Sequence, residues 1–161
     1  MEYKIIEIKD ADSKESYTMS ILKRLPEWFG IPEAIEEYVN NVSSYYYLAA
    51  FDKEVCIGFI SGIIHYGRTG EIYVCGVIPE YQNRGIGKAL VKEEDKYFKK
   101  NGCKYVIVKT LSDIVDNKAY EKTRGFYKRV GFEELVTLRE IWSEENPCLI
   151  MIKEIIVNKI L

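Results

Sequence analysis

The chain has 161 residues, of which 47% are hydrophobic and 30% charged, with only 4 prolines. This composition is typical of a globular protein and excludes a largely disordered one. The formal net charge of −2 excludes a general electrostatic attraction to nucleic acid or anionic membranes. The longest uncharged stretch near the middle of the chain, residues 55–67, is shorter than the ~20 residues of a membrane-spanning helix, so we expect neither a nucleic-acid nor a membrane partner.

Hydrophobic periodicity divides the chain into short strands and helices. Residues 3–8 alternate apolar and polar side chains, as in a half-buried strand, whereas residues 32–42 open with a proline and three glutamates suited to a helix N-terminus. In chain order the pattern predicts a strand at 3–8, helices at about 14–25 and 32–42, strands at 45–51, 55–65 and 71–78, a helix at 87–100, a strand at 105–109, a helix at 119–130, and strands at about 134–142 and 148–155.

This order of elements contains no internal repeat and no linker. We therefore predict one α/β domain over residues 1–161, with a mixed central sheet of about seven strands and flanking helices. The apolar segment 155–161 is expected to pack against another part of the chain. Tyrosines 45–47 are expected on the sheet surface rather than in a ligand site.

The cysteines and the N-terminus indicate a reducing compartment. The N-terminal residues lack the apolar region and cleavage site of a signal peptide, so we expect a cytoplasmic protein. The cysteines show neither CxxC nor Cys/His spacing, which favours packed, reduced thiols and no metal site. They are Cys56, Cys75, Cys103 and Cys148.

A glycine-rich bend joins a strand to a helix in the stretch "VIPEYQNRGIGKAL", residues 77–90. Backbone N–H groups at such a helix start attract phosphate, and Gly85 and Gly87 would let it approach the main chain. A plain tight turn is the alternative. Two other phosphate-binding patterns fail, because Ala89 stands where a Walker loop needs Ser or Thr and Leu90 stands where a dinucleotide fingerprint needs its third glycine.

A third pattern fits this bend. The run V-x-P-x-x-Q-x-x-G-x-G resembles the acyl-CoA signature of the GNAT superfamily of N-acetyltransferases; its matching positions are Val77, Pro79, Gln82, Gly85 and Gly87.

A second motif and the order of elements extend this resemblance over nearly the whole chain. The segment "GFYKRVGF", residues 125–132, resembles the late-helix motif Y-x-x-x-G-F of the superfamily. The stretches "LPEWFGIPEAIEEYV", "EKTRGFY" and "NPCLIMIK" resemble a bacterial subgroup of unassigned substrate.

The resemblance implies that coenzyme A lies between the strands at 71–78 and 105–109, which would separate there. Its pantetheine would pair with the main chain of residues 75–77, and its pyrophosphate would rest on the N–H groups of residues 83–88. Gly76 would then allow a bulge or a close approach, unless it fills a packing gap. The implied cofactor-binding residues are Cys75, Gly76, Val77, Gln82, Asn83, Arg84, Gly85, Ile86, Gly87 and Lys88.

The thioester of acetyl-CoA is already activated, so direct transfer to an amine needs no protein nucleophile. The resemblance makes Tyr127 the general acid that protonates the leaving sulfur, with a core aromatic as the alternative. Glu71, at the start of its strand, is the leading base, acting directly or through water. The alternative for Glu71 is a solvated glutamate, and Asp113 and Asp116 are weaker rivals for the base.

One position departs from the superfamily. Many relatives have an asparagine seven residues before the acid tyrosine, where this chain has Tyr120; Asn117 stands one turn further away. Both are retained as candidate cofactor contacts from this helix.

The resemblance also places the early connector beside the acceptor. Trp28 and Phe29 would line the acceptor pocket, with core packing as the alternative, and Tyr73 would share the strand face of Glu71. His65, the only histidine, is expected at an edge, with an acceptor-site role as the alternative.

These observations predict an N-acetyltransferase that moves acetyl from acetyl-CoA to a primary amine of a small molecule or a peptide. Two alternatives are a non-catalytic acyl-CoA sensor and a nucleotide-binding protein. Because late strands often pair subunits in the superfamily, a homodimer is also expected.

Overall fold

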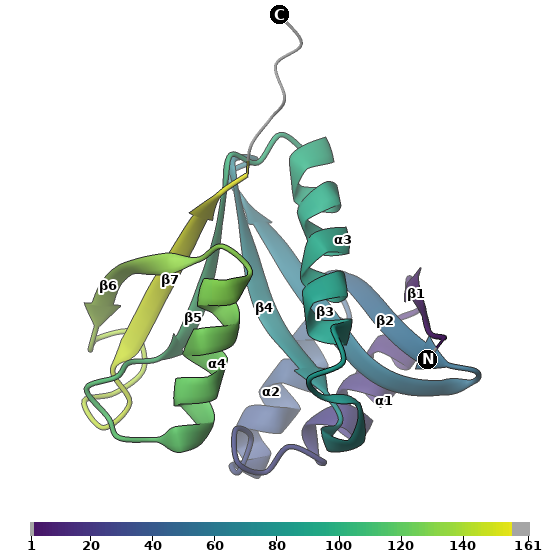
Figure 1. The fold of residues 1–161 in the computed structure, drawn as a ribbon, viewed down its shortest axis with the longest axis horizontal. Helices are drawn as coiled ribbons and strands as arrows, with labels where there is room; N and C mark the ends of the chain where they lie inside the picture. Colours follow the sequence, from purple (N-terminus) through teal and green to yellow (C-terminus); the bar gives the residue numbers. More distant parts are fainter. Residues whose placement is uncertain (1, 156–161) are drawn as a thin grey trace, which may run out of the picture. The chain divides into compact units, whose positions relative to one another are not determined.

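The computed structural model describes residues 2–155 and confirms a mixed α/β fold with a seven-stranded sheet (Figure 1). The elements are β1 (Lys4–Glu7), α1 (Ala11–Leu22), α2 (Pro32–Val42), β2 (Tyr46–Asp52), β3 (Val55–His65), β4 (Thr69–Val77), the short 3-10 helix η1 (Pro79–Tyr81), α3 (Ile86–Lys100), β5 (Tyr105–Leu111), α4 (Lys118–Arg129), β6 (Glu133–Leu138) and β7 (Cys148–Glu154). The strand order is β1-β2-β3-β4-β5-β7-β6.

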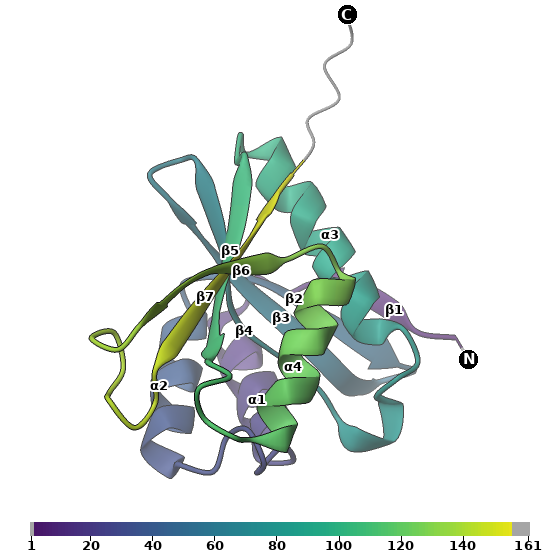
Figure 2. The same cartoon turned by 60° about the vertical axis from the view of Figure 1, so that its left-hand side comes forward.

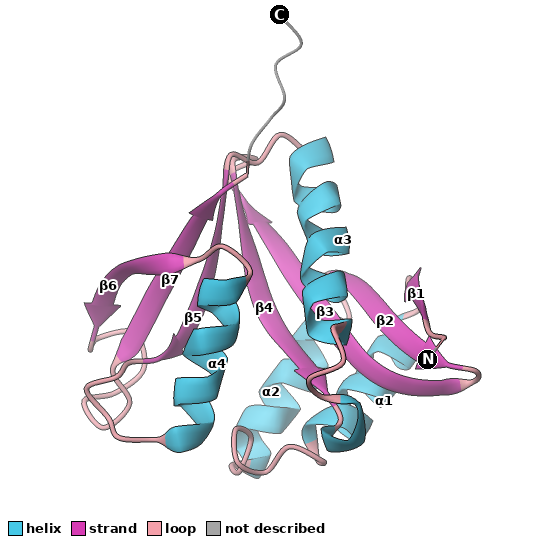
Figure 3. Ribbon diagram, in the orientation of Figure 1, coloured by secondary structure: helices cyan, strands magenta, loops and turns pink. Residues whose placement is uncertain are grey.

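Two compact units make up the described chain. The first comprises residues 2–63 and 73–96, and the second comprises residues 64–72 and 97–155. Strands β3 and β4 contribute residues to both units. Figure 3 shows the helices, the strands and the loops that join them, coloured by type.

In the first unit, two local signals define the early helices. The Asp10 carboxylate accepts a hydrogen bond from the backbone N–H of Ser13, which caps the first turn of α1. Pro32 stands at the start of α2, where its missing N–H costs no helical hydrogen bond. The two helices pack against each other, and β2 pairs with β1 on one side and β3 on the other, antiparallel in both cases.

In the second unit, β5 is the central strand. It pairs in parallel with the start of β4 and antiparallel with β7, which in turn pairs with β6. Helix α4 packs on β5, and the Arg124 guanidinium donates a hydrogen bond to the carbonyl of Leu111 at 2.8 Å. Figure 2 shows β6 and β7 joined by a long connector. Gly70 lies against the ring of Phe98, which leaves no room for a Cβ atom.

The structure differs from the expectations at several element boundaries and in the burial of Tyr47. Helix α1 begins at Ala11 rather than near residue 14, because Asp10 caps it, and β6 ends at Leu138 rather than near residue 142. Tyr47 is fully buried, not on the sheet surface, and its hydroxyl lies 2.9 Å from that of Thr18. The expected packing of the C-terminal segment concerns residues 156–161, which lie outside the described residues.

Membrane-spanning helices are absent from the part of the chain that the structure describes, because none of its helices combines the required length with sufficient hydropathy.

Candidate active site

The glycine-rich bend forms an open helix start in the first unit. Gly85 has φ = +84°, a left-handed conformation that favours glycine, and a Cβ atom built there would meet nothing within 4 Å. The N–H of Ala89 donates to the carbonyl of Gly85 at 3.0 Å. The preceding N–H groups of the first turn of α3, at residues 86–88, therefore have no carbonyl of their own helix to bind. The bend is suited to an anion such as a diphosphate.

Side chains of the loop fix its path before the helix. The Gln82 amide donates a hydrogen bond to the carbonyl of Val77 at 2.9 Å, which ties the loop to the end of β4. Asn83 has φ = 61°, a conformation in which asparagine is one of the better tolerated residues. The guanidinium of Arg84 lies 5.3 Å from the ring centre of Tyr81. Lys88 is exposed, so both cationic side chains are placed on the surface of the bend.

Gly76 is explained by packing. A Cβ atom at Gly76 would lie 2.8 Å from the Cδ1 of Leu25 and 3.1 Å from the Cγ2 of Ile21, both on or beside α1. The packing alternative thus accounts for this glycine without a ligand. Gly76 and its neighbours Cys75 and Val77 are nonetheless only half-buried.

Glu71 is buried in the second unit. The alternative expected from the sequence, a solvated glutamate at the start of its strand, is therefore wrong. Its side chain is only 6% exposed, and its Oε1 lies 2.7 Å from the Nε2 of His65. The other carboxylate oxygen lies 3.5 Å from the ammonium group of Lys109. Cys148, on β7, is close enough to both charges to interact with them electrostatically.

The expected opening between β4 and β5 does not extend to Glu71. The two strands pair in parallel from Thr69 with Tyr105 to Ile72 with Val108. The main chain at Glu71 and Ile72 therefore takes part in sheet pairing with β5, so any separation of the two strands lies beyond Ile72.

Burial keeps two thiols protonated. It raises the pKa of the Cys148 thiol to about 11, against the opposing effect of Lys109, and raises that of Cys56 to about 11. All the described cysteines are free, as expected for reduced thiols. Because the thiolate is the reactive form, these groups are poor nucleophiles near neutral pH.

Tyr127 is buried near the C-terminal end of α4. Its ring lies 5.6 Å from that of Phe132 in an edge-to-face arrangement and 5.4 Å from that of Phe126. Tyr127 and Phe132 are the first and last residues of the Y-x-x-x-G-F motif, from which the role of general acid was inferred. The packing fixes the tyrosine ring and is compatible with both the acid and the core-aromatic readings.

The start of α4 uses Asn117 as a cap. Its side-chain oxygen accepts a hydrogen bond from the backbone N–H of Tyr120 at 3.2 Å. Burial raises the pKa of the Tyr120 hydroxyl, so this residue stays a neutral hydrogen-bonding group. The structure therefore gives Asn117 a structural task in addition to the cofactor contact proposed for it.

Aromatic side chains from four segments of the chain meet in the first unit. Tyr38 of α2 links Phe29 of the α1–α2 connector to Tyr73 of β4, with ring centres 5.7 and 5.4 Å apart. Tyr45 adds a fourth ring, 5.0 Å from Tyr73. The amide of Asn41 donates a hydrogen bond to the hydroxyl of Tyr73 at 2.8 Å. We call Phe29, Tyr38, Tyr45 and Tyr73 the aromatic cluster.

Comparison with known proteins decides the family. Residues 5–132 of the 161 match the Acetyltransferase (GNAT) family. The chain belongs to this family. The match includes the glycine-rich bend, Glu71 and Tyr127, and it supports an N-acetyltransferase function over that of a non-catalytic acyl-CoA sensor.

Individual relatives of this GNAT protein are distant. It is 23% identical over 137 residues to an uncharacterized N-acetyltransferase of Chlorobaculum tepidum, covering 80% of each chain. The solved ribosomal-protein-S18-alanine N-acetyltransferase of Escherichia coli has a TM-score of 0.75 and 18% identity over 99% of each chain. An aminoglycoside 6'-N-acetyltransferase complexed with coenzyme A has a TM-score of 0.75 and 19% identity, also over 99% of each chain.

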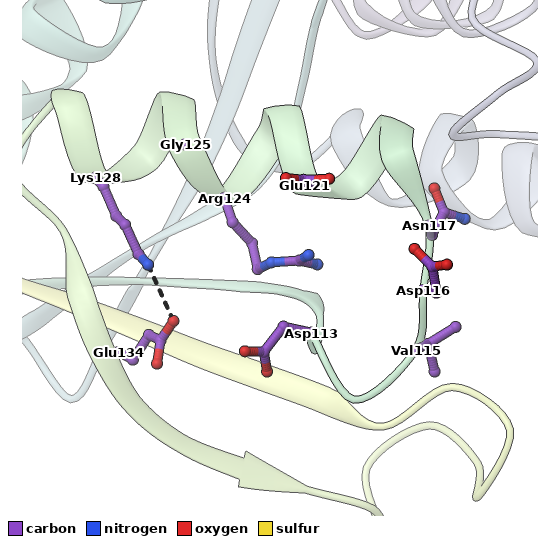
Figure 4. Close-up of a pocket in the computed structure, with 9 residues that line it drawn as sticks. All are labelled: Asp113, Val115, Asp116, Asn117, Glu121, Arg124, Gly125, Lys128 and Glu134. Carbon is purple, nitrogen blue, oxygen red and sulfur yellow. Dashed lines mark ion pairs between the residues drawn. The ribbon is translucent and has the colours of Figure 1, made fainter.

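A pocket of about 630 Å³ lies beside α4 of this GNAT protein, in the second unit (Figure 4). Asp113 and Asp116, the rival bases, line it together with Asn117. Lys128 and Glu134 also line it and form an ion pair at 3.2 Å. Of the residues assigned to the active site from the sequence, only Asn117 lines this pocket.

Sequence reasoning missed the partners of the assigned residues. His65 and Lys109 were not linked to Glu71, although His65 and Glu71 flank one short turn and a hairpin brings such residues close together. Tyr38 and Asn41 are three residues apart and share a face of α2, a spacing that the sequence displays. The sequence does not show which strand this face of α2 packs against, because that depends on the tertiary structure.

Proposed function

We propose that this protein transfers an acetyl group from acetyl-CoA to a primary amine, by direct attack of the amine on the thioester. The observation that carries the proposal is the open helix start at Gly85, with its free space and with first-turn N–H groups that have no carbonyl of their own helix to bind, in a chain of the acetyltransferase family. A related structure of similar fold is complexed with coenzyme A.

The first unit would hold the donor. The N–H groups of residues 83–88 would bind its diphosphate, with Arg84 and Lys88 adding positive charge. Residues 75–77 are half-buried, and their main chain would pair with the pantetheine as an added strand does. An N–H group at Cys75 or Gly76 would stabilise the negative charge that develops on the carbonyl oxygen. The thioester supplies an acyl carbon that needs no further activation.

Tyr127 would protonate the leaving thiolate. Its ring is held by Phe126 and Phe132, so that its hydroxyl would keep a defined position. General acid catalysis of this kind typically contributes about 10²- to 10⁴-fold in rate.

Glu71 would act as the base that removes a proton from the attacking amine. The attacking amine must be neutral and must lose a proton during the reaction. A buried carboxylate held between His65 and Lys109 can accept that proton directly or through water, or can act through a neighbouring group.

The aromatic cluster, with the nearby Trp28, would line the acceptor site. The half-buried rings of Phe29, Tyr38 and Tyr73 offer π faces to an ammonium or alkylamine group. Structural relatives act on an alanine of a ribosomal protein and on aminoglycosides, as their names state. We propose a small-molecule or peptide amine here; a homodimer and a cytoplasmic location stay predictions.

A liberated-thiol assay tests this function. The protein is incubated with acetyl-CoA and, in turn, spermidine, kanamycin and a short peptide beginning with alanine. Release of coenzyme A that requires an added amine supports the proposal. Thermal stabilisation by acetyl-CoA without thiol release from any amine would instead favour a sensor, and preferential stabilisation by ATP would favour a nucleotide-binding protein.

A further inference from the structure

His65 and Glu71 form a hydrogen-bonded pair whose members differ in exposure. The distance between the His65 Nε2 and the Glu71 Oε1 is 2.7 Å. The carboxylate side chain is 6% exposed and the imidazole side chain 41%. The buried member of the pair therefore has little access to bulk water, whereas the imidazole has ample access.

The charges around the pair define where a proton can be held. Lys109, on β5, places its ammonium group 3.5 Å from the second carboxylate oxygen. Cys148, on β7, is a further titratable group that interacts electrostatically with Glu71 and Lys109, and burial keeps its thiol neutral by raising its pKa to about 11. Glu71 thus contacts two nitrogen groups, through a hydrogen bond with His65 and an ion pair with Lys109, and a carboxylate can only accept hydrogen bonds.

The acceptor role of Glu71 fixes the state of the ring. If the carboxylate only accepts, the His65 Nε2 carries a hydrogen and the other ring nitrogen, Nδ1, holds the lone pair of the neutral imidazole. A carboxylate in this position orients an imidazole and stabilises the imidazolium without itself taking the proton.

We propose that His65 is the proton acceptor of the amine side and that Glu71 is its positioning residue. This inference rests on the proposed acetyltransferase function and replaces direct proton uptake by Glu71 with uptake at the Nδ1 of His65.

The proton balance is complete without another reactant. The amine nitrogen forms a bond to the acyl carbon, and the bond from that carbon to sulfur breaks. The nitrogen gives its extra proton to Nδ1 of His65, directly or through one water, and the departing thiolate takes a proton from Tyr127. The exposed imidazolium then releases its proton to bulk water. The Tyr127 phenolate is protonated again by a proton from the solvent.

Nuclear magnetic resonance tests the pair without any substrate. His65 is the only histidine of the chain, so the imidazole nitrogen signals need no assignment by mutation. The neutral ring is expected in the Nε2–H form in the wild-type protein and as a mixture of both forms in Glu71→Leu. A wild-type ring in the Nδ1–H form would overturn the proposal.

Kinetics test the proton transfer. In His65→Gln the side-chain amide can still donate to Glu71 but cannot accept a proton, so a purely structural role would be preserved. We expect kcat/KM for the best amine of the thiol-release panel to fall about 100-fold, with an unchanged melting temperature. In His65→Ala, added imidazole is expected to restore part of the rate.

The outcomes separate the two proposals. A His65→Gln enzyme with the rate and pH profile of wild type, or a His65→Ala enzyme indifferent to imidazole, would overturn the role of His65 and leave the acetyltransferase assignment standing. Absence of amine-dependent thiol release from the wild-type protein would overturn that assignment itself, while the tautomer would still report on the pair.

Discussion

The side-chain amide of Gln82 donates a hydrogen bond to the main-chain carbonyl of Val77 at 2.9 Å. This contact joins the end of β4 to the loop that leads into α3, across η1. It fixes the loop relative to the strand whose main chain would pair with pantetheine. Gln82 is therefore expected to act on donor binding by positioning the loop.

Replacing Gln82 with methionine keeps the size of the side chain and removes the donor. A single neutral hydrogen bond contributes about 1 kcal/mol, so we expect the Kd for acetyl-CoA to rise about fivefold. Isothermal titration calorimetry measures this Kd. An unchanged affinity in Gln82→Met would show that the loop is held by other contacts.

Tyr127→Phe removes the hydroxyl of the proposed acid and keeps the ring contacts with Phe126 and Phe132. We expect kcat to fall about 100-fold with little change in the KM for acetyl-CoA. Tyr97→Phe, on α3, serves as the control and is expected to keep the wild-type kcat. A wild-type rate in Tyr127→Phe would identify Tyr127 as a core aromatic.

The fold was largely predictable because local signals mark most of its elements. Pro32 marked the start of α2, and β3 runs from Val55 to His65 as predicted. The errors occurred where a single side chain decides the boundary or the burial. Asp10 extends α1 by capping it, and Thr18 gives the hydroxyl of Tyr47 a partner in the core. Neither pairing is visible in the periodicity.

The aromatic cluster predicts a loss of acceptor binding in Tyr38→Ala. Tyr38 contacts both Phe29 and Tyr73, so its removal breaks the series of rings. We expect a higher KM for the amine and an unchanged KM for acetyl-CoA in steady-state kinetics.

A control for general destabilisation is available in the same unit. Tyr17 packs edge-to-face on Phe51 with ring centres 5.4 Å apart, outside the aromatic cluster. Tyr17→Ala removes a comparable ring pair and is expected to leave both KM values unchanged. Equal increases in the amine KM for the two variants would argue against an acceptor role for Tyr38.

The buried thiol of Cys148 predicts a fall in stability at alkaline pH. Its pKa is raised to about 11 in the folded protein, so between about pH 8.5 and 11 the thiol is ionised in the unfolded chain and protonated in the folded one. The unfolded state then binds fewer protons, and the free energy of unfolding falls as pH rises, by about 1 kcal/mol per pH unit for this group.

Urea unfolding between pH 7.5 and 10.5 measures this dependence. Cys148→Ala lacks the titrating group, so its free energy of unfolding should fall less steeply above pH 8.5 than that of the wild-type protein. Parallel pH profiles for the two proteins would show that the thiol does not contribute.

The candidate site was predictable to the extent that it follows from short motifs. Gln82, Gly85 and Tyr127 occupy motif positions, and the structure gives Gly85 a left-handed conformation that favours glycine. Lys109 could not be linked to Glu71 from the sequence because it comes from a separate strand, β5, whereas the short turn between β3 and β4 could have suggested His65. Gly76 was ambiguous, since only the tertiary structure places α1 against it.

The account depends on the binding of a diphosphate at the turn of Gly85, and one calorimetric comparison tests this directly. Gly85→Glu adds bulk and negative charge at the bend, and Gly67→Glu makes the same change at another left-handed glycine, φ = +66°, in the β3–β4 turn. We predict that Gly85→Glu loses measurable binding of acetyl-CoA, while Gly67→Glu retains the wild-type Kd with a similar melting temperature. Wild-type affinity in Gly85→Glu would contradict the account.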